Sequence, residues 1–210
     1  MYDTYENLPE EKKKRIYDAC LEEFAKMGYA GASTNEIVKK AGISKGLLFH
    51  YFDNKKNLFL YILDKAIAHS LDRFKTECRT LPADLFDRIA HIGMVRILIG
   101  NEEPLIYELL FNAFYKMPDE LRNELNQRYE KINKEETPTV LDGIDLSRLR
   151  FSIKPDKAIS TVLIFLEGLQ KRYINQPGEL SAQKTYTDRE TIFKEIMEYM
   201  DILKKGIYMK

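Results

Sequence analysis

The segment 33–52 constrains the fold most, because it contains two helix starts and a helix-breaking glycine. Ser33 and Glu36 have the spacing of a capping box, which predicts the start of a short helix. Gly42 ends that helix, and Ser44 is a suitable N-cap for a second short helix. Two short helices joined by a glycine turn predict a helix-turn-helix motif.

The second short helix has two different faces. Leu48 and Phe52 are four residues apart and are expected to be buried together. The remaining side chains would then face outward, namely Lys45, Gly46, Leu47, Phe49 and His50. The major groove of DNA accepts one α-helix, and the first amides of the preceding helix can bind a phosphate. The motif therefore predicts DNA binding, and the alternative is an ordinary pair of short helices within a helical core.

The helical period also dominates the rest of the chain, without a convincing strand alternation. Further helices are expected at 9–27, 55–80, 83–99, 102–116, 118–136, 156–175 and 188–206. Residues 137–154 and 175–186 are expected to be loops. The prediction is an all-α fold of about nine helices, with an N-terminal helix-turn-helix domain at 9–69 and a larger helical ligand-binding and dimerisation domain at 70–210.

The charge pattern limits DNA contact to a small part of the chain. The 33 basic and 33 acidic residues give a formal net charge of zero. A protein that contacts nucleic acid along its whole length would normally be basic. Residues 33–56 contain five lysines and two acidic residues, a net charge of +3. DNA contact is therefore expected around the predicted motif.

Other classes of protein find little support in the sequence. No apolar stretch reaches the length of a membrane span, and the acidic start does not resemble a signal peptide, so a cytoplasmic location is expected. His50, His69 and His91 have no partners at metal-ligand spacing. We find no catalytic constellation and no phosphate-binding glycine loop, so neither a metal, nor a cofactor, nor enzyme activity is predicted.

The run 42–52, followed by Asn54-Lys55-Lys56-Asn57-Leu58, resembles the tetracycline-repressor (TetR) family of regulators. Phe24, Gly28, Thr34, Ile37 and Ala41 extend the resemblance, which spans residues 10–60 and places the motif at 32–51. It implies a homodimer on a palindromic double-stranded DNA operator, usually a repressor released by a small molecule. By position, it implies DNA contacts at Thr34, Asn35, Lys45, Gly46, Leu47, Phe49, His50, Tyr51 and Lys55.

These contacts are expected to have different roles. Thr34, Tyr51 and Lys55 would hold phosphates, whereas Lys45, Leu47 and His50 would face base edges. The sequence departs from the family at Phe49, which is usually tyrosine, and at Leu47, which is often threonine. Because few polar groups then remain for base readout, DNA shape is expected to supplement it.

The last two predicted helices, 156–175 and 188–206, carry wide apolar stripes. Ordinary core packing is one explanation. The resemblance favours the other, a four-helix interface between two copies of the chain. One helix-turn-helix buries too little surface to bind DNA tightly, and a two-fold dimer would read two half-sites about 34 Å apart.

The middle helices are rich in large apolar and aromatic side chains. Most of these are explained by ordinary core packing. The functional alternative is a pocket for an unknown small hydrophobic ligand, with few polar groups. Its candidate lining is Phe86, Ile89, His91, Met94, Tyr107, Phe111, Phe114, Phe165 and Leu169. A competing hypothesis for the whole chain is a protein-interaction adaptor that uses the apolar Leu47 and Phe49.

Overall fold

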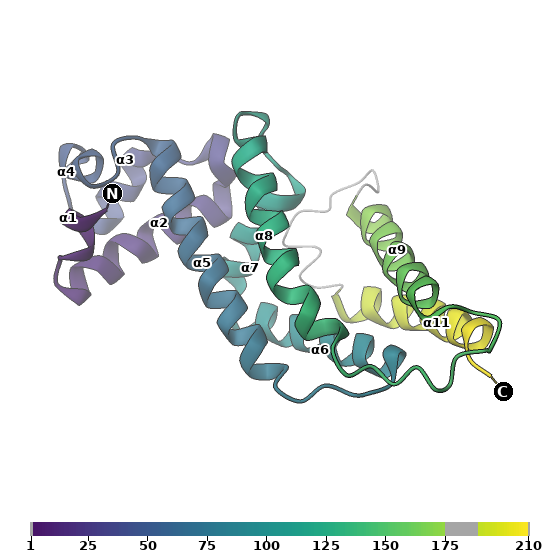
Figure 1. Cartoon of the computed structure of the whole chain (residues 1–210). Coiled ribbons are helices and arrows are strands. Elements are labelled where there is room, and N and C mark those ends of the chain that lie inside the picture. Colours follow the sequence, from purple (N-terminus) through teal and green to yellow (C-terminus); the bar gives the residue numbers. More distant parts are fainter. Residues whose placement is uncertain (1, 175–188, 210) are drawn as a thin grey trace. The chain divides into compact units, whose positions relative to one another are not determined.

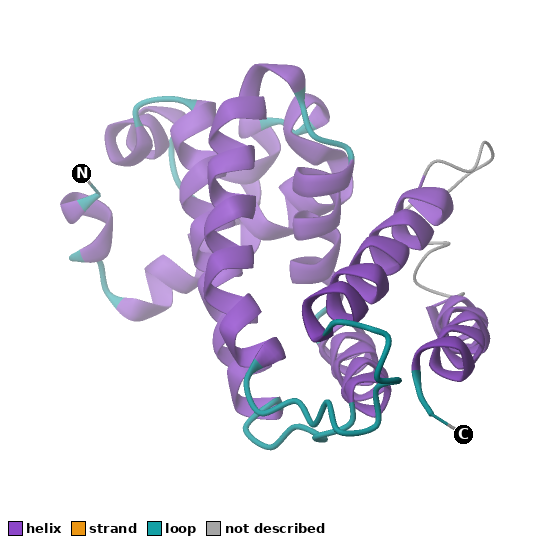
Figure 2. Cartoon of the chain, turned by 45° about the vertical axis from the view of Figure 1, so that its right-hand side comes forward, coloured by secondary structure: helices purple, strands orange, loops and turns teal. Residues whose placement is uncertain are grey.

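The computed structural model describes residues 2–174 and 189–209, without the side chains of 136–139, 170–174 and 189. These residues form helices and two isolated bridges, with no strand among them (Figure 2). The helices are labelled in Figure 1: α1 (Asp3–Glu6), α2 (Glu10–Gly31), α3 (Thr34–Ala41), α4 (Lys45–Phe52), α5 (Lys55–Glu77), α6 (Leu85–Glu102), α7 (Pro104–Tyr115), the 3-10 turn η1 (Asp119–Leu121), α8 (Arg122–Leu141), α9 (Pro155–Ile174) and α11 (Arg189–Ile207). The predicted all-α fold is confirmed.

The helices differ from the prediction most clearly at α1, α2 and α8, and the other boundaries differ by up to a few residues. Helix α1 was not expected, because four residues carry no periodic signal. Helix α2 reaches Gly31, although its backbone breaks at Gly28 with φ 63° and ψ 177°. Helix α8 continues to Leu141, so the first residues of the loop predicted at 137–154 are helical. The loop predicted at 175–186 and the helix-terminal residue 188 lie outside the described residues.

The chain divides into two compact units. Unit 1 consists of Met1–Arg73 and Glu102–Lys131, and unit 2 of Phe74–Asn101 and Ile132–Lys210. The predicted DNA-binding domain, 9–69, therefore lies within unit 1 and forms only part of it. Helix α5 is continuous and contributes residues to both units.

The core of unit 1 joins the helix-turn-helix to α2, α5 and α7. Phe24, Leu48, Phe52 and Leu109 are fully buried in it. Helix α7 packs against α2. The Asn112 side-chain amide donates to a backbone carbonyl of α2 over 2.7 Å. The two helices of the motif are therefore held by a core that includes a helix distant in sequence.

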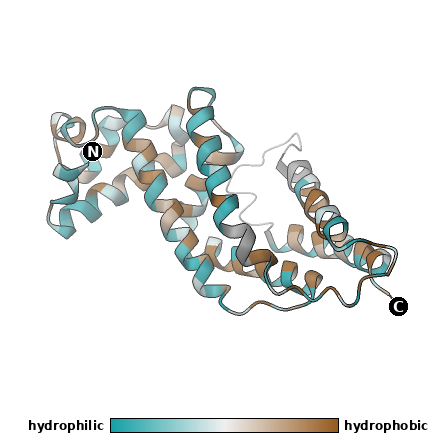
Figure 3. Ribbon diagram, in the orientation of Figure 1, coloured by the Kyte–Doolittle hydropathy of each residue, from teal (hydrophilic) through white to brown (hydrophobic). Residues whose placement is uncertain are grey.

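Unit 2 has a separate core, built from α6, α9, α11 and the segment 142–153. Phe86, Val162 and Met200 are buried there. Brown apolar positions recur along α9 and α11 in Figure 3. None of the described helices is long and apolar enough to cross a lipid bilayer.

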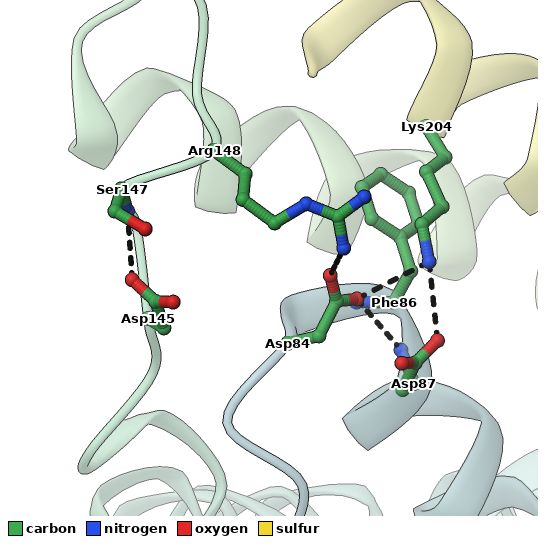
Figure 4. Close-up of polar contacts among 7 residues, drawn as sticks. All are labelled: Asp84, Phe86, Asp87, Asp145, Ser147, Arg148 and Lys204. Atoms are coloured by element: carbon green, nitrogen blue, oxygen red, sulfur yellow. Dashed lines mark hydrogen bonds and ion pairs between the residues drawn. The ribbon is translucent and has the colours of Figure 1, made fainter. Parts of the chain in front are cut away.

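Asp84 connects three elements of unit 2 (Figure 4). Its carboxylate accepts the amides of Phe86 and Asp87 at 3.0 and 3.1 Å and so caps α6. Arg148 and Lys204 pair with the same carboxylate at 2.8 and 3.4 Å. Burial by itself would raise the pKa of Asp84, but the two amides and the Lys204 charge outweigh it, and the pKa lies below its ordinary value. One carboxylate therefore joins α6, the 142–153 segment and α11.

Replacing Asp84 with asparagine is expected to remove a pH-dependent part of the stability. A lowered folded-state pKa stabilises the fold above the unfolded pKa of about 3.9, and this is lost as the pH falls through the folded value. The asparagine side chain can still cap α6 but cannot form ion pairs, so the loss at pH 7 should be about 1 kcal/mol. Urea unfolding from pH 7 to pH 2 measures the difference, which should shrink with acid. The exposed Asp201→Asn is the control, and an acid-independent Asp84→Asn effect would contradict the prediction.

Candidate nucleic-acid interface

Side-chain caps and a left-handed glycine build the helix-turn-helix. The Ser33 hydroxyl accepts the Glu36 amide at 3.5 Å, and the Ser44 hydroxyl accepts the Leu47 amide at 3.2 Å. Gly42 ends α3 with φ 63°, a conformation that glycine adopts without steric cost. The next amide, that of Ile43, closes the turn on a carbonyl of α3. The caps predicted at Ser33 and Ser44 are confirmed.

The second half of the expected capping box has a different partner. The Ser33 amide donates to the carboxylate of Glu23, on α2, over 2.9 Å and not to Glu36. Glu23 is only 7 % exposed. At the other end of α3, the Arg15 side chain donates to the Ala41 carbonyl over 2.8 Å. An acid at the N-terminus and a base at the C-terminus both complement the helix dipole.

Helix α2 therefore holds α3 at both ends. Neither Glu23 nor Arg15 was predicted as part of the site. In the sequence, both look like ordinary charged residues of a surface helix. Their spacing along α2 therefore does not indicate that they bond to the two ends of α3. The arrangement fixes the first helix of the motif, whose first residues are Thr34 and Asn35. Thr34 is half-buried and Asn35 is exposed.

Helix α4 presents a polar outer face and an apolar inner face. Leu48 and Phe52 are fully buried, as predicted. Lys45, Gly46 and His50 are exposed. The exposed side of α4 thus combines a cation, an imidazole and a backbone without a side chain, which allows close approach to another molecule.

Leu47 and Phe49 face outward only in part. Both are half-buried, and Leu47 packs against the core of unit 1. The Lys45 ammonium lies 6.0 Å from the centre of the Phe49 ring, at the limit of a cation–π contact. Tyr51 is 6 % exposed and packs its ring toward the core, so little of it is available to a phosphate.

Three lysines in and just after the motif have partners within unit 1. The Lys55 ammonium donates to the Ala30 carbonyl over 3.2 Å and lies 5.1 Å from the Tyr29 ring. Lys40 pairs with Glu22 at 3.3 Å, and Lys56 pairs with Glu124. Because these acids lie outside 33–56, the local charge is less positive than the sequence count indicated.

Comparison with known proteins identifies the family to which this chain belongs. Residues 16–62 match the sequence pattern described as "Bacterial regulatory proteins, tetR family". YerO of Bacillus subtilis, an uncharacterised HTH-type transcriptional regulator, is 37 % identical over 204 residues, which cover 94 % of this chain and 66 % of YerO. Rv2912c of Mycobacterium tuberculosis, of the same description, is 29 % identical over 136 residues, covering 63 % of this chain and 70 % of that protein. The chain belongs to the TetR family.

Solved structures of the same fold cover almost the whole chain. A TetR family transcriptional regulator from Chloroflexus aurantiacus has a TM-score of 0.59 and 23 % identity, covering 99 % of this chain and 98 % of the other. A putative transcriptional regulator from Saccharomonospora viridis, solved in complex with choline, has a TM-score of 0.64 and 16 % identity, covering 96 % and 100 %. These structures share the fold, and the matched sequence pattern together with YerO identifies this TetR-family chain as a transcriptional regulator with a DNA-binding helix-turn-helix domain.

The candidate pocket residues of this TetR-family chain are divided between the units. Tyr107, Phe111 and Phe114 belong to unit 1, and the other six belong to unit 2: Phe86, Ile89, His91, Met94, Phe165 and Leu169. Phe86 and Leu169 are buried, and Met94 is 57 % exposed. Phe86 packs edge-on against Tyr208 at 5.2 Å between ring centres, which is the packing of a core residue. The pocket stays a prediction.

The predicted dimer helices of this TetR-family chain combine core and exposed apolar residues. Val162 of α9 and Met200 of α11 are buried within unit 2, as ordinary core packing would require. Leu163 and Ile164 of α9 are 41 % and 69 % exposed, and Ile202 of α11 is 65 % exposed. Apolar surface therefore remains on both helices after the core of the unit is filled.

Proposed function

We propose that this TetR-family regulator is a homodimeric repressor that binds a palindromic operator through α3 and α4. The observation that carries the proposal is the outer face of α4, where Lys45, Gly46 and His50 are exposed while Leu48 and Phe52 anchor the helix. Such a helix suits the major groove. The amides at the start of α3 and the charge of Lys55 would hold phosphates.

A homodimer through α9 and α11 is the second part of the proposal. Leu163, Ile164 and Ile202 are exposed apolar side chains, and removing such side chains from water favours association. A dimer would double the DNA contacts and match a palindrome. We place the functional boundary at residues 69 and 70, with DNA binding at 9–69 and ligand binding and dimerisation at 70–210.

Release by a small, largely apolar ligand completes the proposed mechanism. The S. viridis relative was solved with choline, so a protein of this fold holds a small molecule. A ligand can weaken DNA binding only through different affinities for the bound and released states, typically by about 1–3 kcal/mol. The adaptor alternative rested on Leu47 and Phe49, and their partial burial weakens it. A cytoplasmic location remains the expectation.

Electrophoretic mobility shifts with the DNA upstream of the protein's own gene test the proposal. We expect one retarded complex, a palindromic footprint and a dimer in sedimentation equilibrium. Binding should also weaken with salt, with a log–log slope of about −7 if a dimer neutralises about eight phosphates. A monomer that ignores DNA at low ionic strength would refute the proposal.

Single substitutions in α4 and at the start of α5 are expected to separate base contacts from phosphate contacts. Lys55→Ala should weaken binding to all sequences about equally, because a phosphate contact carries no sequence information. Lys45→Ala and Leu47→Ala should also reduce the preference for the operator, by about 1–3 kcal/mol for a base contact. Competition titrations with operator and scrambled DNA measure both effects. Lys14→Ala, on α2, is the charge-matched control, and equal losses on every sequence for all three variants would exclude the base-facing assignments.

A further inference from the structure

The segment 2–8, which precedes α2 and contains α1, lies near the recognition helix α4 (Figure 1), and its tyrosine rings contact the buried side of α4. The Tyr5 ring is 2 % exposed. Its centre lies 4.9 Å from that of Phe52 and 6.0 Å from that of Tyr51. The Tyr2 ring lies 5.6 Å from Phe52. These spacings fall in the range of favourable aromatic pairs.

The segment is itself fixed to α2 and α5. The Tyr5 hydroxyl donates to the Lys13 carbonyl over 2.9 Å. The Glu6 carboxylate accepts the Tyr61 hydroxyl at 2.6 Å and pairs with Lys65 at 2.8 Å. The Tyr5 ring is thus held between α2 and α5 while it contacts α4.

The recognition helix depends on such tertiary contacts for its orientation. Helix α4 has eight residues, and isolated helices of that length are unstable in water. Three of its side chains are buried, namely Leu48, Tyr51 and Phe52. Two of these three, Tyr51 and Phe52, contact the rings of the 2–8 segment.

We infer that residues 2–8 are a positioning segment for DNA reading, in which Tyr5 sets the angle at which α4 is presented to the duplex. The inference rests on the proposed operator binding by α4. Tyr5 touches no DNA in this arrangement, because it is buried. It acts through Tyr51 and Phe52, so its loss should affect the reading of bases by α4 more than the phosphate contacts at Thr34 and Lys55.

Tyr5→Ala tests the inference, with Leu109→Ala as a matched control. Leu109 is fully buried in the same core, on α7, so both variants remove a large buried side chain. Tyr5→Ala should reduce the ratio of operator to scrambled-DNA affinity about tenfold, the size of one lost base contact. Leu109→Ala should change this ratio by less than about twofold, and so should Tyr5→Phe, which keeps the ring. Affinities are measured below the unfolding temperature of each variant.

Hydrogen exchange of the DNA-free protein provides a second readout. The amides of 45–52 should exchange about tenfold faster in Tyr5→Ala than in Leu109→Ala, because local opening of α4 becomes easier. If Tyr5→Ala does not fold, Tyr2→Ala decides the matter, since Tyr2 is only half-buried. Unchanged exchange and unchanged discrimination in the folded variant would overturn the inference. If the wild type itself ignores DNA, the proposed function fails, and the exchange of 45–52 still decides whether the segment holds α4.

Discussion

Arg88→Leu is expected to lower the free energy of unfolding by about 3 kcal/mol, because a buried charged donor would be lost and its acceptors left unpaired. Arg88 is 3 % exposed. Its guanidinium donates to the Pro82 carbonyl at 2.6 Å and to the Val140 carbonyl at 3.1 Å. It also donates to the carbonyls of Asp142 and Gly143. Four carbonyls in two segments far apart in sequence therefore depend on one side chain.

The carbonyls of 140–143 lie at and beyond the C-terminal end of α8, where the helix dipole is negative and a cation is favourable. Urea unfolding monitored by circular dichroism measures the loss. Arg88→Lys keeps the charge but not the planar fork of donors, so it should lie between the wild type and Arg88→Leu. Stability of Arg88→Leu within about 0.5 kcal/mol of the wild type would contradict this account.

Gly93→Val is expected to cost about 1–3 kcal/mol by overpacking the contact between α6 and α11. A Cβ atom at position 93 would overlap the Phe193 ring and lie 3.0 Å from its Cδ2 atom. Thermal and urea unfolding measure the loss of stability. If α11 forms the proposed dimer surface, its displacement should also raise the dimer dissociation constant in sedimentation equilibrium.

Two further variants make this second prediction specific to the Phe193 contact. Gly206→Ala, on the same helix as Phe193, introduces a methyl group that would meet nothing within 4 Å. It should be neutral or stabilise by up to about 1 kcal/mol, through helix propensity. In the double variant Gly93→Val, Phe193→Leu, the smaller side chain should recover part of the loss. If Gly93→Val alone were as stable as Gly206→Ala, the close approach of Phe193 would not limit the packing.

Much of the candidate site could be predicted from local chemistry. Ser33, Gly42 and Ser44 act on backbone groups within three to five residues, so their spacing in the sequence already indicates where α3 and α4 begin and end. The four-residue spacing of Leu48 and Phe52 likewise indicated the buried face of α4. Contacts made within one helical turn leave a periodic pattern that a single sequence displays.

Local spacing was less informative about how exposed each outward residue is. Leu47 and Phe49 were expected to face outward and are half-buried, and Leu47 packs against the core of unit 1. Lys55 was expected to be available to a phosphate and contacts the Ala30 carbonyl. Exposure depends on what packs alongside a helix, and a helical wheel does not contain that information.

The amino-acid pattern alone established an all-α chain with a helix-turn-helix near its N-terminus, because caps, glycine stops and apolar periodicity are properties of neighbouring residues. Tertiary packing alone decided that Glu23 and Arg15 hold the two ends of α3, that Tyr5 supports α4, and that 102–131 joins the first unit. These contacts link residues that are distant along the chain. They follow from which surfaces meet in the folded core, and no local pattern encodes that choice.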